Sequence, residues 1–166
     1  GGSDGVKYYI SMQDTNDEWH LFVYDTRRNL WHREDALHVI DFAWNGDLYF
    51  LDSDGTIWMN GNARNVPSEA SSEGTVQSEC VFGDFTGGSS NKKGASKLQM
   101  RMELSAGSTV QVAMQFDSDG VWHTVRTLSA TKKRSFYLPI IPRRNDHYRI
   151  KLSGSGEWRL YSLVYE

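Results

Sequence analysis

The side chains best suited to chemistry in this sequence are its carboxylates and histidines, and their spacing limits what they can do. Residues 52–55 and 117–120 share the sequence Asp-Ser-Asp-Gly, which could offer oxygen ligands to calcium. An EF-hand loop also needs a glycine at its sixth position and a glutamate at its twelfth, and neither segment has them. Because Asp tolerates left-handed backbone geometry and Gly adopts it freely, we interpret both segments as hairpin turns.

Neither a metal site nor a catalytic group is indicated by the remaining polar residues. Zinc ligands follow characteristic spacings, and no such spacing joins the five histidines, which are His20, His32, His38, His123 and His147. Glycosidases use two carboxylates, but the sequence marks no pair that faces a cleft. We therefore predict no catalytic residue, no metal and no cofactor, and interpret the acidic groups as solvated charge.

The six tryptophans are more distinctive than the ionisable groups. Sugar-binding sites stack sugar rings on exposed aromatic side chains, whereas most tryptophans pack in a core. Trp19 lies in the polar segment Asn-Asp-Glu-Trp-His and is expected to be the most exposed. If the chain binds a glycan, the candidate binding residues are Trp19, Tyr24, Trp31 and Tyr49.

A basic cluster in the second half of the chain could contact phosphate or carboxylate groups, which suit the planar fork of arginine. Its members are Lys132, Lys133, Arg134, Arg143 and Arg144. The net charge is −3, and basic and aromatic residues do not alternate as they do in RNA-binding surfaces. We predict no nucleic-acid partner, and expect either a protein contact or a structural pair such as Arg144 with Asp146.

The single cysteine, Cys80, excludes an intrachain disulfide and is expected to be a small buried hydrophobe. No apolar run approaches the roughly 20 residues that span a bilayer, so no membrane association is predicted. The opening Gly1-Gly2-Ser3 resembles an expression remnant or a linker, and we assign residues 1–6 to that role. This leaves open that the chain is a piece of a longer protein.

The charge distribution of the 166-residue chain predicts two units. Residues 1–70 hold 5 Lys+Arg and 12 Asp+Glu, a net charge of −7, and residues 71–166 hold 13 and 9, a net charge of +4. Residues 61–76 are rich in Gly, Asn, Ser and Glu and lose periodicity, which marks a boundary. We predict a β unit at 7–62, a linker or crossover at 63–76, and a second β domain at 77–166.

The first unit is predicted to be an antiparallel meander that resembles blades of a β-propeller. Short alternating segments are separated by polar turns, and Asn45-Gly46 is a strong hairpin signal. A propeller usually closes with four to eight blades, so this unit is either part of a larger propeller or a small open sheet. The expected strands are 7–12, 19–25, 30–33, 38–44, 47–51 and 56–60.

The second unit is predicted to be a β-sandwich of the jelly-roll or immunoglobulin type, because alternating segments and turn signals recur every 8–12 residues. No convincing amphipathic helix is present in the sequence, so the whole chain is expected to be all-β. Two of the turns are placed at 106–108 and at 129–135. The expected strands are 77–85, 97–105, 109–116, 121–128, 136–140, 146–152 and 158–165.

A turn of sequence Pro-Arg-Arg-Asn-Asp, residues 142–146, joins two of these strands. We predict that it forms a hydrogen-bonded structural corner that fixes the strands on either side. The corner residues are Arg143, Arg144, Asp146 and His147.

Segments 115–125 and 136–166 together resemble the C-terminal domain of virion structural proteins from tailed phages and prophages of Gram-positive bacteria. In those proteins an Asp-Ser-Asp-Gly-x-Trp hairpin precedes a Leu-Pro-Ile-x-Pro-Arg-Arg-x-Asp-His segment. The matching residues are Asp117, Ser118, Asp119, Gly120, Trp122, Leu138, Pro139, Ile140, Pro142, Arg143, Arg144, Asp146, His147, Arg149, Gly154, Gly156, Tyr161 and Ser162. Asn145 stands where the family pattern often has Cys.

The resemblance covers 77–166 well and 7–60 loosely, and implies a non-enzymatic structural protein of a phage tail or head–tail connector. Its expected partners are other virion proteins and further copies of itself, and its expected location is the virion. The alternative from the residues alone is a carbohydrate-binding module that recognises a host-surface glycan.

Overall fold

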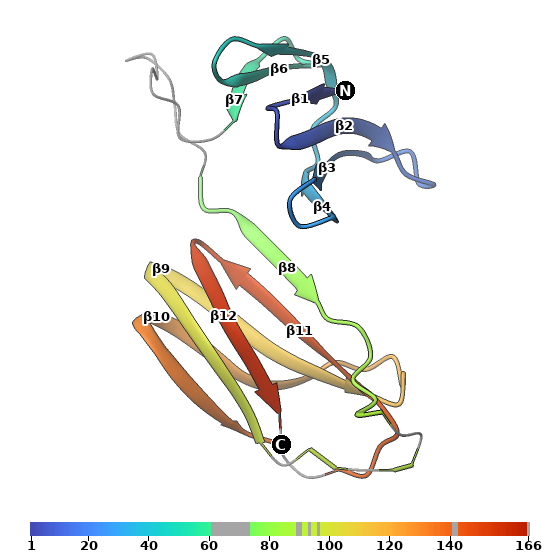
Figure 1. The fold of residues 1–166 in the computed structure, drawn as a ribbon, viewed down its shortest axis with the longest axis vertical. Coiled ribbons are helices and arrows are strands. Elements are labelled where there is room, and N and C mark those ends of the chain that lie inside the picture. The colour runs from blue at the N-terminus through green and yellow to red at the C-terminus, as the bar shows by residue number, and fades with distance from the viewer. Residues whose placement is uncertain (61–73, 89–90, 93, 96, 141–142, 166) are drawn as a thin grey trace. The chain divides into compact units, whose positions relative to one another are not determined.

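The computed structural model describes residues 1–60, 74–88, 91–92, 94–95, 97–140 and 143–165, apart from the side chains of 130 and 131. The chain divides into two compact units, Gly1–Ser71 and Ser72–Glu166 (Figure 1). Every regular element in the described part is a β-strand, which confirms the predicted all-β class. The described residues accordingly contain no helix of the length and apolar character that a bilayer crossing requires.

Unit 1 consists of two antiparallel meanders, as predicted (Figure 1). Neither sheet closes on itself within the described residues. The first sheet has the order β1-β2-β3-β4 and the second the order β5-β6-β7. The strands are β1 (Gly2–Ser3), β2 (Lys7–Gln13), β3 (Trp19–Asp25), β4 (Leu30–Asp35), β5 (Val39–Trp44), β6 (Leu48–Asp52) and β7 (Ile57–Asn60).

The core of unit 1 forms from one face of each meander. Leu21 and Val23 of β3 are buried and alternate with side chains of the opposite face, as strand geometry requires. Ser11 joins the two sheets: its hydroxyl donates to the carbonyl of Leu37 and accepts from the backbone N–H of Val39. The buried core residues are Tyr9, Leu21, Val23, Val39, Leu48 and Phe50.

The first residues of the chain belong to the fold, which differs from their assignment as a remnant or linker. Gly2 and Ser3 pair with Tyr9 and Tyr8 of β2. A Cβ atom on Gly2 would lie 2.5 Å from Cβ of Phe42, so the missing side chain allows close packing. Most of the segment 63–76, predicted as a linker or crossover, lies outside the described residues.

Unit 2 is built around one long, bent hairpin of β9 and β10. These strands pair along their length, from Lys97 with Pro139 to Met114 with His123. On its other edge β9 pairs with β12 along its first half and with β11 along its second half, and β8 pairs with β11. The strands are β8 (Gln77–Val81), β9 (Lys97–Phe116), β10 (His123–Pro139), β11 (Tyr148–Ser155) and β12 (Trp158–Tyr165).

Two turns predicted in unit 2 are wrong, because the chain bends there without reversing. Residues 106–108 lie inside β9, where Gly107 has a φ of 81°, and residues 129–135 lie inside β10. The two halves of β9 therefore pair with β10 rather than with each other. Register shifts in the opposing part of β10 accommodate the bend.

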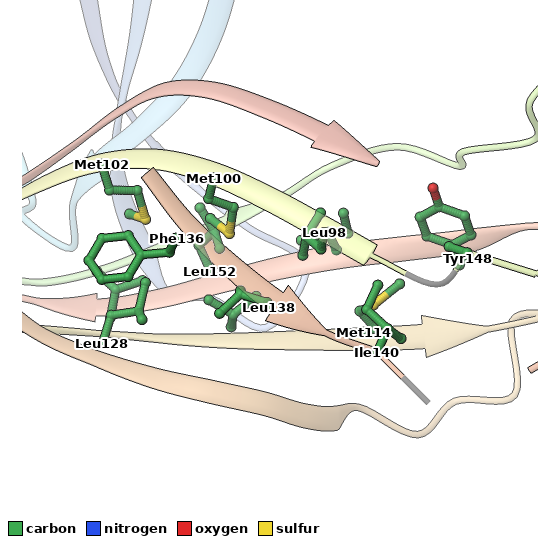
Figure 2. Packing of buried hydrophobic residues seen from close by; sticks show 14 of the residues in the cluster. Leu98, Met100, Met102, Met114, Leu128, Phe136, Leu138, Ile140, Tyr148 and Leu152 are labelled. Atoms are coloured by element: carbon green, nitrogen blue, oxygen red, sulfur yellow. The ribbon is translucent and has the colours of Figure 1, made fainter. Parts of the chain in front are cut away.

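The bend places both halves of β9 around one core, so that the unit is a sandwich. Figure 2 shows Leu98, Met100 and Met102 of the first half, and Met114 of the second, pointing into the same packed space. Phe136 and Leu138 of β10 reach that space as well (Figure 2). The predicted alternation of buried residues is confirmed along 97–104, whereas residues 112–116 are all buried.

Cys80 is exposed, which contradicts its prediction as a buried residue. It lies opposite Leu152 on β8, and its side chain is on the core-facing side of the sheet. Because β8 is the last strand of the sheet, no strand among the described residues lies beyond it to shield the Cys80 side chain.

Truncation of Leu152, which is 0% exposed, tests whether the two layers of unit 2 share one core. We expect Leu152→Ala to lower the free energy of unfolding of unit 2 by about 2–5 kcal/mol, because it leaves a cavity between packed side chains. The measurement is urea unfolding of the full chain. Val164→Ala, at a residue 48% exposed, is the control and should change stability by less than about 0.5 kcal/mol. Equal effects of the two variants would contradict this description of the core.

Candidate functional site

The sheet of β1 to β4 carries apolar side chains on the face turned away from the unit 1 core. Tyr8, Tyr24 and Trp31 lie directly opposite one another across β2, β3 and β4. Tyr8 is 41% exposed, Met12 41% and Trp31 53%. We call this surface the aromatic face; its members are Tyr8, Ile10, Met12, Phe22, Tyr24 and Trp31.

The aromatic face follows from strand alternation, because the residues between its members form the core. Tyr9 is buried between Tyr8 and Ile10, and Val23 is buried between Phe22 and Tyr24. An antiparallel sheet with one solvated face normally shows polar residues on that face. This sheet carries mainly apolar side chains on that face, together with His20 opposite Met12 and Arg33 opposite Phe22. The described residues of unit 1 leave much of the face exposed.

Two of the four predicted aromatic binding residues come together on this face. The ring centroids of Tyr24 and Trp31 are 5.0 Å apart, and the ring planes are inclined by 33°. The Tyr24 hydroxyl donates a hydrogen bond to the Asn29 side chain, which fixes the orientation of its ring. The pair therefore presents a large, oriented aromatic surface.

The other two predicted residues lie elsewhere. Trp19 is at the start of β3, where its ring stacks on His38 with centroids 3.6 Å apart and planes 11° apart. Tyr49 is in the second meander, opposite Ala43 and Met59. The four residues do not make a single site.

Trp19 and His38 line an open depression of about 500 Å³ in unit 1. Asp52 and Asp54 also border it, so the depression contains carboxylates. Asp52 is 5% exposed and bonded within its own turn: the indole N–H of Trp58 and the N–H groups of Thr56 and Asp54 hold its pKa below the ordinary value. Asp52 thus serves to shape the hairpin.

The structure brings together two groups of potential metal ligands that the sequence did not indicate. One is Asp14, Glu18 and His20, whose ligand atoms lie within 4.8 Å of one another. His20 Nε2 is 3.3 Å from Asp14 Oδ2. The other Asp14 oxygen accepts the backbone N–H groups of Asn16 and Glu18, and these bonds lower the pKa of Asp14. The carboxylate therefore shapes the β2–β3 turn.

The second group is Asp117, Asp146 and His147, at the predicted corner of unit 2. Asp117 Oδ1 accepts the backbone N–H of Asp146 at 2.8 Å, and the N–H of Asp117 donates to the carbonyl of His147 at 3.1 Å. Ser118 Oγ is 2.8 Å from His147 Nε2. Asn145, which is 1% exposed, donates from its side chain to the same His147 carbonyl. The contacts join the 117–120 turn to the chain entering β11.

The predicted ion pair of Arg144 with Asp146 is wrong. Asp146 Oδ1 contacts His147 Nδ1, and no ion pair of Arg144 occurs among the described residues. Arg143 lies over the ring of Phe116 and 3.9 Å from a carboxylate oxygen of Asp119. The corner depends on hydrogen bonds to the 117–120 turn, because Asp117 engages the Asp146 backbone.

Ser118, His147 and Asp146 form a hydrogen-bonded row like that which activates a serine nucleophile. Such catalysis also needs donors that stabilise an oxyanion and a site that limits access of water. Ser118 is exposed in a turn, and the Asp146 side chain is 49% exposed. The row is best explained as part of the corner.

Asp117 and Ser118 are the corner residues that the sequence did not identify. Their segment was recognised as a turn, but its contact with 145–147 joins positions 29 residues apart, which a local pattern does not reveal. Both have positive φ angles, 52° and 53°, which non-glycine residues rarely adopt. Such a backbone persists only where surrounding contacts hold it.

Comparison with known proteins adds little to this description. No protein-family model matches the chain, and no curated protein matches it. A similar solved structure is a glycoside hydrolase family 43 arabinoxylan arabinofuranohydrolase from Bacillus subtilis, in complex with cellotetraose. The identity is 11% and the TM-score 0.38, with 99% of this chain and 41% of that chain covered. The chain thus spans less than half of that enzyme, and this likeness supports no functional assignment.

The charge of Asp117 can be tested through the pH dependence of stability. The backbone N–H of Asp146 is the main cause that holds the pKa of Asp117 below its ordinary value. A carboxyl with a lowered folded-state pKa stabilises the fold above its unfolded pKa of about 3.9, and this contribution is lost as pH falls further. Asp117→Asn keeps the side-chain shape and tolerates the positive φ.

We expect Asp117→Asn to unfold more readily than the wild type at pH 7. The difference should shrink as pH falls below the unfolded-state pKa of about 3.9 toward the lowered folded-state pKa of Asp117. Thermal unfolding of unit 2 between pH 2 and 7 measures the difference. A difference that stays constant over this range would show that the charge plays no part.

Proposed function

We propose that the chain is a non-enzymatic structural protein of a tailed-phage or prophage particle, which acts by assembling with other proteins. The aromatic face of unit 1 is the observation that supports this role most strongly. Exposed apolar patches on soluble proteins mark interaction surfaces. A row of Tyr8, Tyr24 and Trp31 in register is such a patch, built on a sheet rather than on a loop.

The residue types on this surface suit a protein interface. Trp, Tyr and Arg are the residues that dominate binding energy at protein contacts. Arg33 lies opposite Phe22 on β4 and borders the aromatic face with a positive charge. Each buried aromatic side chain removes roughly 150–250 Å² from water, so a few rings can anchor a partner.

Open strand edges also favour assembly. β4 ends the first sheet of unit 1 and β8 ends the sheet of unit 2, with no further strand beside either among the described residues. Unpaired N–H and C=O groups along an edge recruit other strands. The partners we propose are other proteins of the particle and further copies of this chain, and the location is the virion.

The residues that carry the family resemblance fit a structural role. Asp117, Ser118, Asp146 and His147 bond to one another at the corner. Their role there is to hold the 117–120 turn against the start of β11. A shared motif of this kind preserves a fold rather than a reaction.

Glycan binding is a second candidate, and the Tyr24–Trp31 pair is the observation that favours it. Sugar rings stack on exposed aromatic rings, and in this pair Trp31 is exposed and Tyr24 is half-buried. The two ring planes are inclined by 33°, however, so they do not form one flat platform. The depression lined by Trp19 is a separate place, because neither Tyr24 nor Trp31 is among the described residues that line it.

Mass spectrometry of purified particles tests the proposed role. After prophage induction of the bacterium that carries the gene, we expect the chain to co-purify with intact particles in constant ratio to the major capsid protein. The same preparation from a strain without the gene is the control. Absence of the chain from intact particles would overturn the proposal.

Site-directed photo-crosslinking tests the surface. A photoreactive phenylalanine derivative in place of Trp31 should crosslink to a particle protein after assembly, because the aromatic face is buried there. The matched control is the same substitution at Ile57, which is 71% exposed and lies outside the aromatic face. Equal crosslinking at both sites would refute an interface there, and glycan-array binding that Trp31→Ala abolishes would favour the sugar-binding alternative.

A further inference from the structure

The outer edge of β8 is the feature of unit 2 that the fold leaves open. β8 ends its sheet in the order β10-β9-β11-β8 (Figure 1). Its residues are all exposed. Its only strand partner among the described residues is β11. One edge of β8 is therefore free along the strand.

The register identifies which backbone groups point outward. Phe82 donates its N–H to the carbonyl of Ile150 on β11, and the Val76 carbonyl accepts the N–H of Gly156. In an antiparallel ladder, alternate residues direct both backbone groups to the same neighbour. Even-numbered residues of β8 thus bond to β11, and the N–H and C=O groups of Gln77, Glu79 and Val81 face the open edge.

β8 lacks the features that usually prevent an edge from pairing. Natural edge strands are protected by proline, lysine, bulges or inward-pointing charges. β8 has no proline and no lysine, and its register with β11 is regular. Its one charged side chain, Glu79, lies on the face of the sheet opposite the core, 3.5 Å from Lys151 Nζ and 3.2 Å from Ser153 Oγ.

We propose that β8 pairs antiparallel with β8 of a second copy of the chain, which joins two unit 2 sheets edge to edge. This deepens the assembly role proposed above and rests on it. Two symmetric registers use the outward groups of Glu79 and Val81. One places Glu79 opposite the second copy's Glu79, and the other places Cys80 opposite the second copy's Cys80.

Charge repulsion favours the register that places Cys80 opposite Cys80. Like charges directly opposite each other in a sheet are destabilising. With Cys80 on the two-fold axis, Glu79 faces Val81 of the second copy and the two carboxylates are kept apart. The Cys80 residues then form a pair without hydrogen bonds between them, with Cα atoms about 4.5 Å apart. This is within the range of about 4.4–6.8 Å that a disulfide can bridge.

Sedimentation velocity of the reduced full chain over a range of concentrations tests the pairing. We expect a dimer that Cys80→Ser retains, because the backbone makes the contact. Val81→Pro should raise the dimer Kd at least about tenfold, since it removes an outward N–H in each copy. Val81→Thr keeps that N–H and the branched shape, and should dimerise like the wild type. A monomer at all concentrations, or equal dimerisation of the proline and threonine variants, would overturn the inference.

Two further measurements fix the register and do not depend on the proline variant folding. Diamide oxidation at dimer-forming concentrations should link the wild type through Cys80, and a dimer that diamide cannot link would exclude this register. By NMR, the amide protons of Glu79 and Val81 should gain protection from exchange as concentration rises, whereas those of Ser78 and Cys80 are protected throughout. Fast exchange of Glu79 and Val81 at every concentration would also overturn the pairing.

The test of β8 pairing and the test of the virion role can fail independently of each other. A chain that is present in particles but shows no β8 pairing retains its assembly role and loses this inference. A chain that pairs through β8 but is absent from particles loses the virion role, and the dimer stands by itself.

Discussion

A β-strand has two faces and two edges, and an apolar face or unpaired edge that the chain itself does not cover is left open to solvent or to a partner. The chain covers both edges of β9, because β10 lies along one edge and β11 and β12 share the other. Its apolar face is buried along both halves. β4 and β8 each end a sheet and have one edge without a strand partner among the described residues.

The same constraint explains why the two units differ. Unit 2 folds one long hairpin over itself, so that Met100 and Met114 from opposite halves of β9 line the same core (Figure 2). Unit 1 has two short meanders, which bury one face of each sheet around Val23 and Leu48. The second face of the β1–β4 sheet has no second layer among the described residues. For this reason we propose that it is an interaction surface.

Local sequence patterns predicted most of the strands, because alternation and turn residues act over short distances. β3 occupies the predicted range, 19–25. The bend at Gly107 was mistaken for a turn. Inward-facing residues on both sides of it, such as Leu104 and Val110, have even numbers, and this pattern does not reveal which strand pairs with β9. The exposure of Cys80 likewise depends on the place of β8 in the sheet, which a local pattern does not reveal. The contact of Asp117 with Asp146 joins residues 29 positions apart, which is also beyond the reach of a local pattern. The sequence named Tyr24 and Trp31 as binding residues, but only the β3–β4 register shows that they are neighbours and that Trp19 and Tyr49 are not.

We propose that the aromatic face is covered when the protein is in its functional state. Hydroxyl-radical footprinting of the free chain and of intact particles tests it directly, because oxidation of Tyr8, Met12 and Trp31 reports their access to solvent. We expect rapid oxidation of all three in the free chain and strong protection in the particle. Trp44, which is 56% exposed and outside the face, is the internal reference. Equal oxidation of the aromatic face in both states would contradict the proposal.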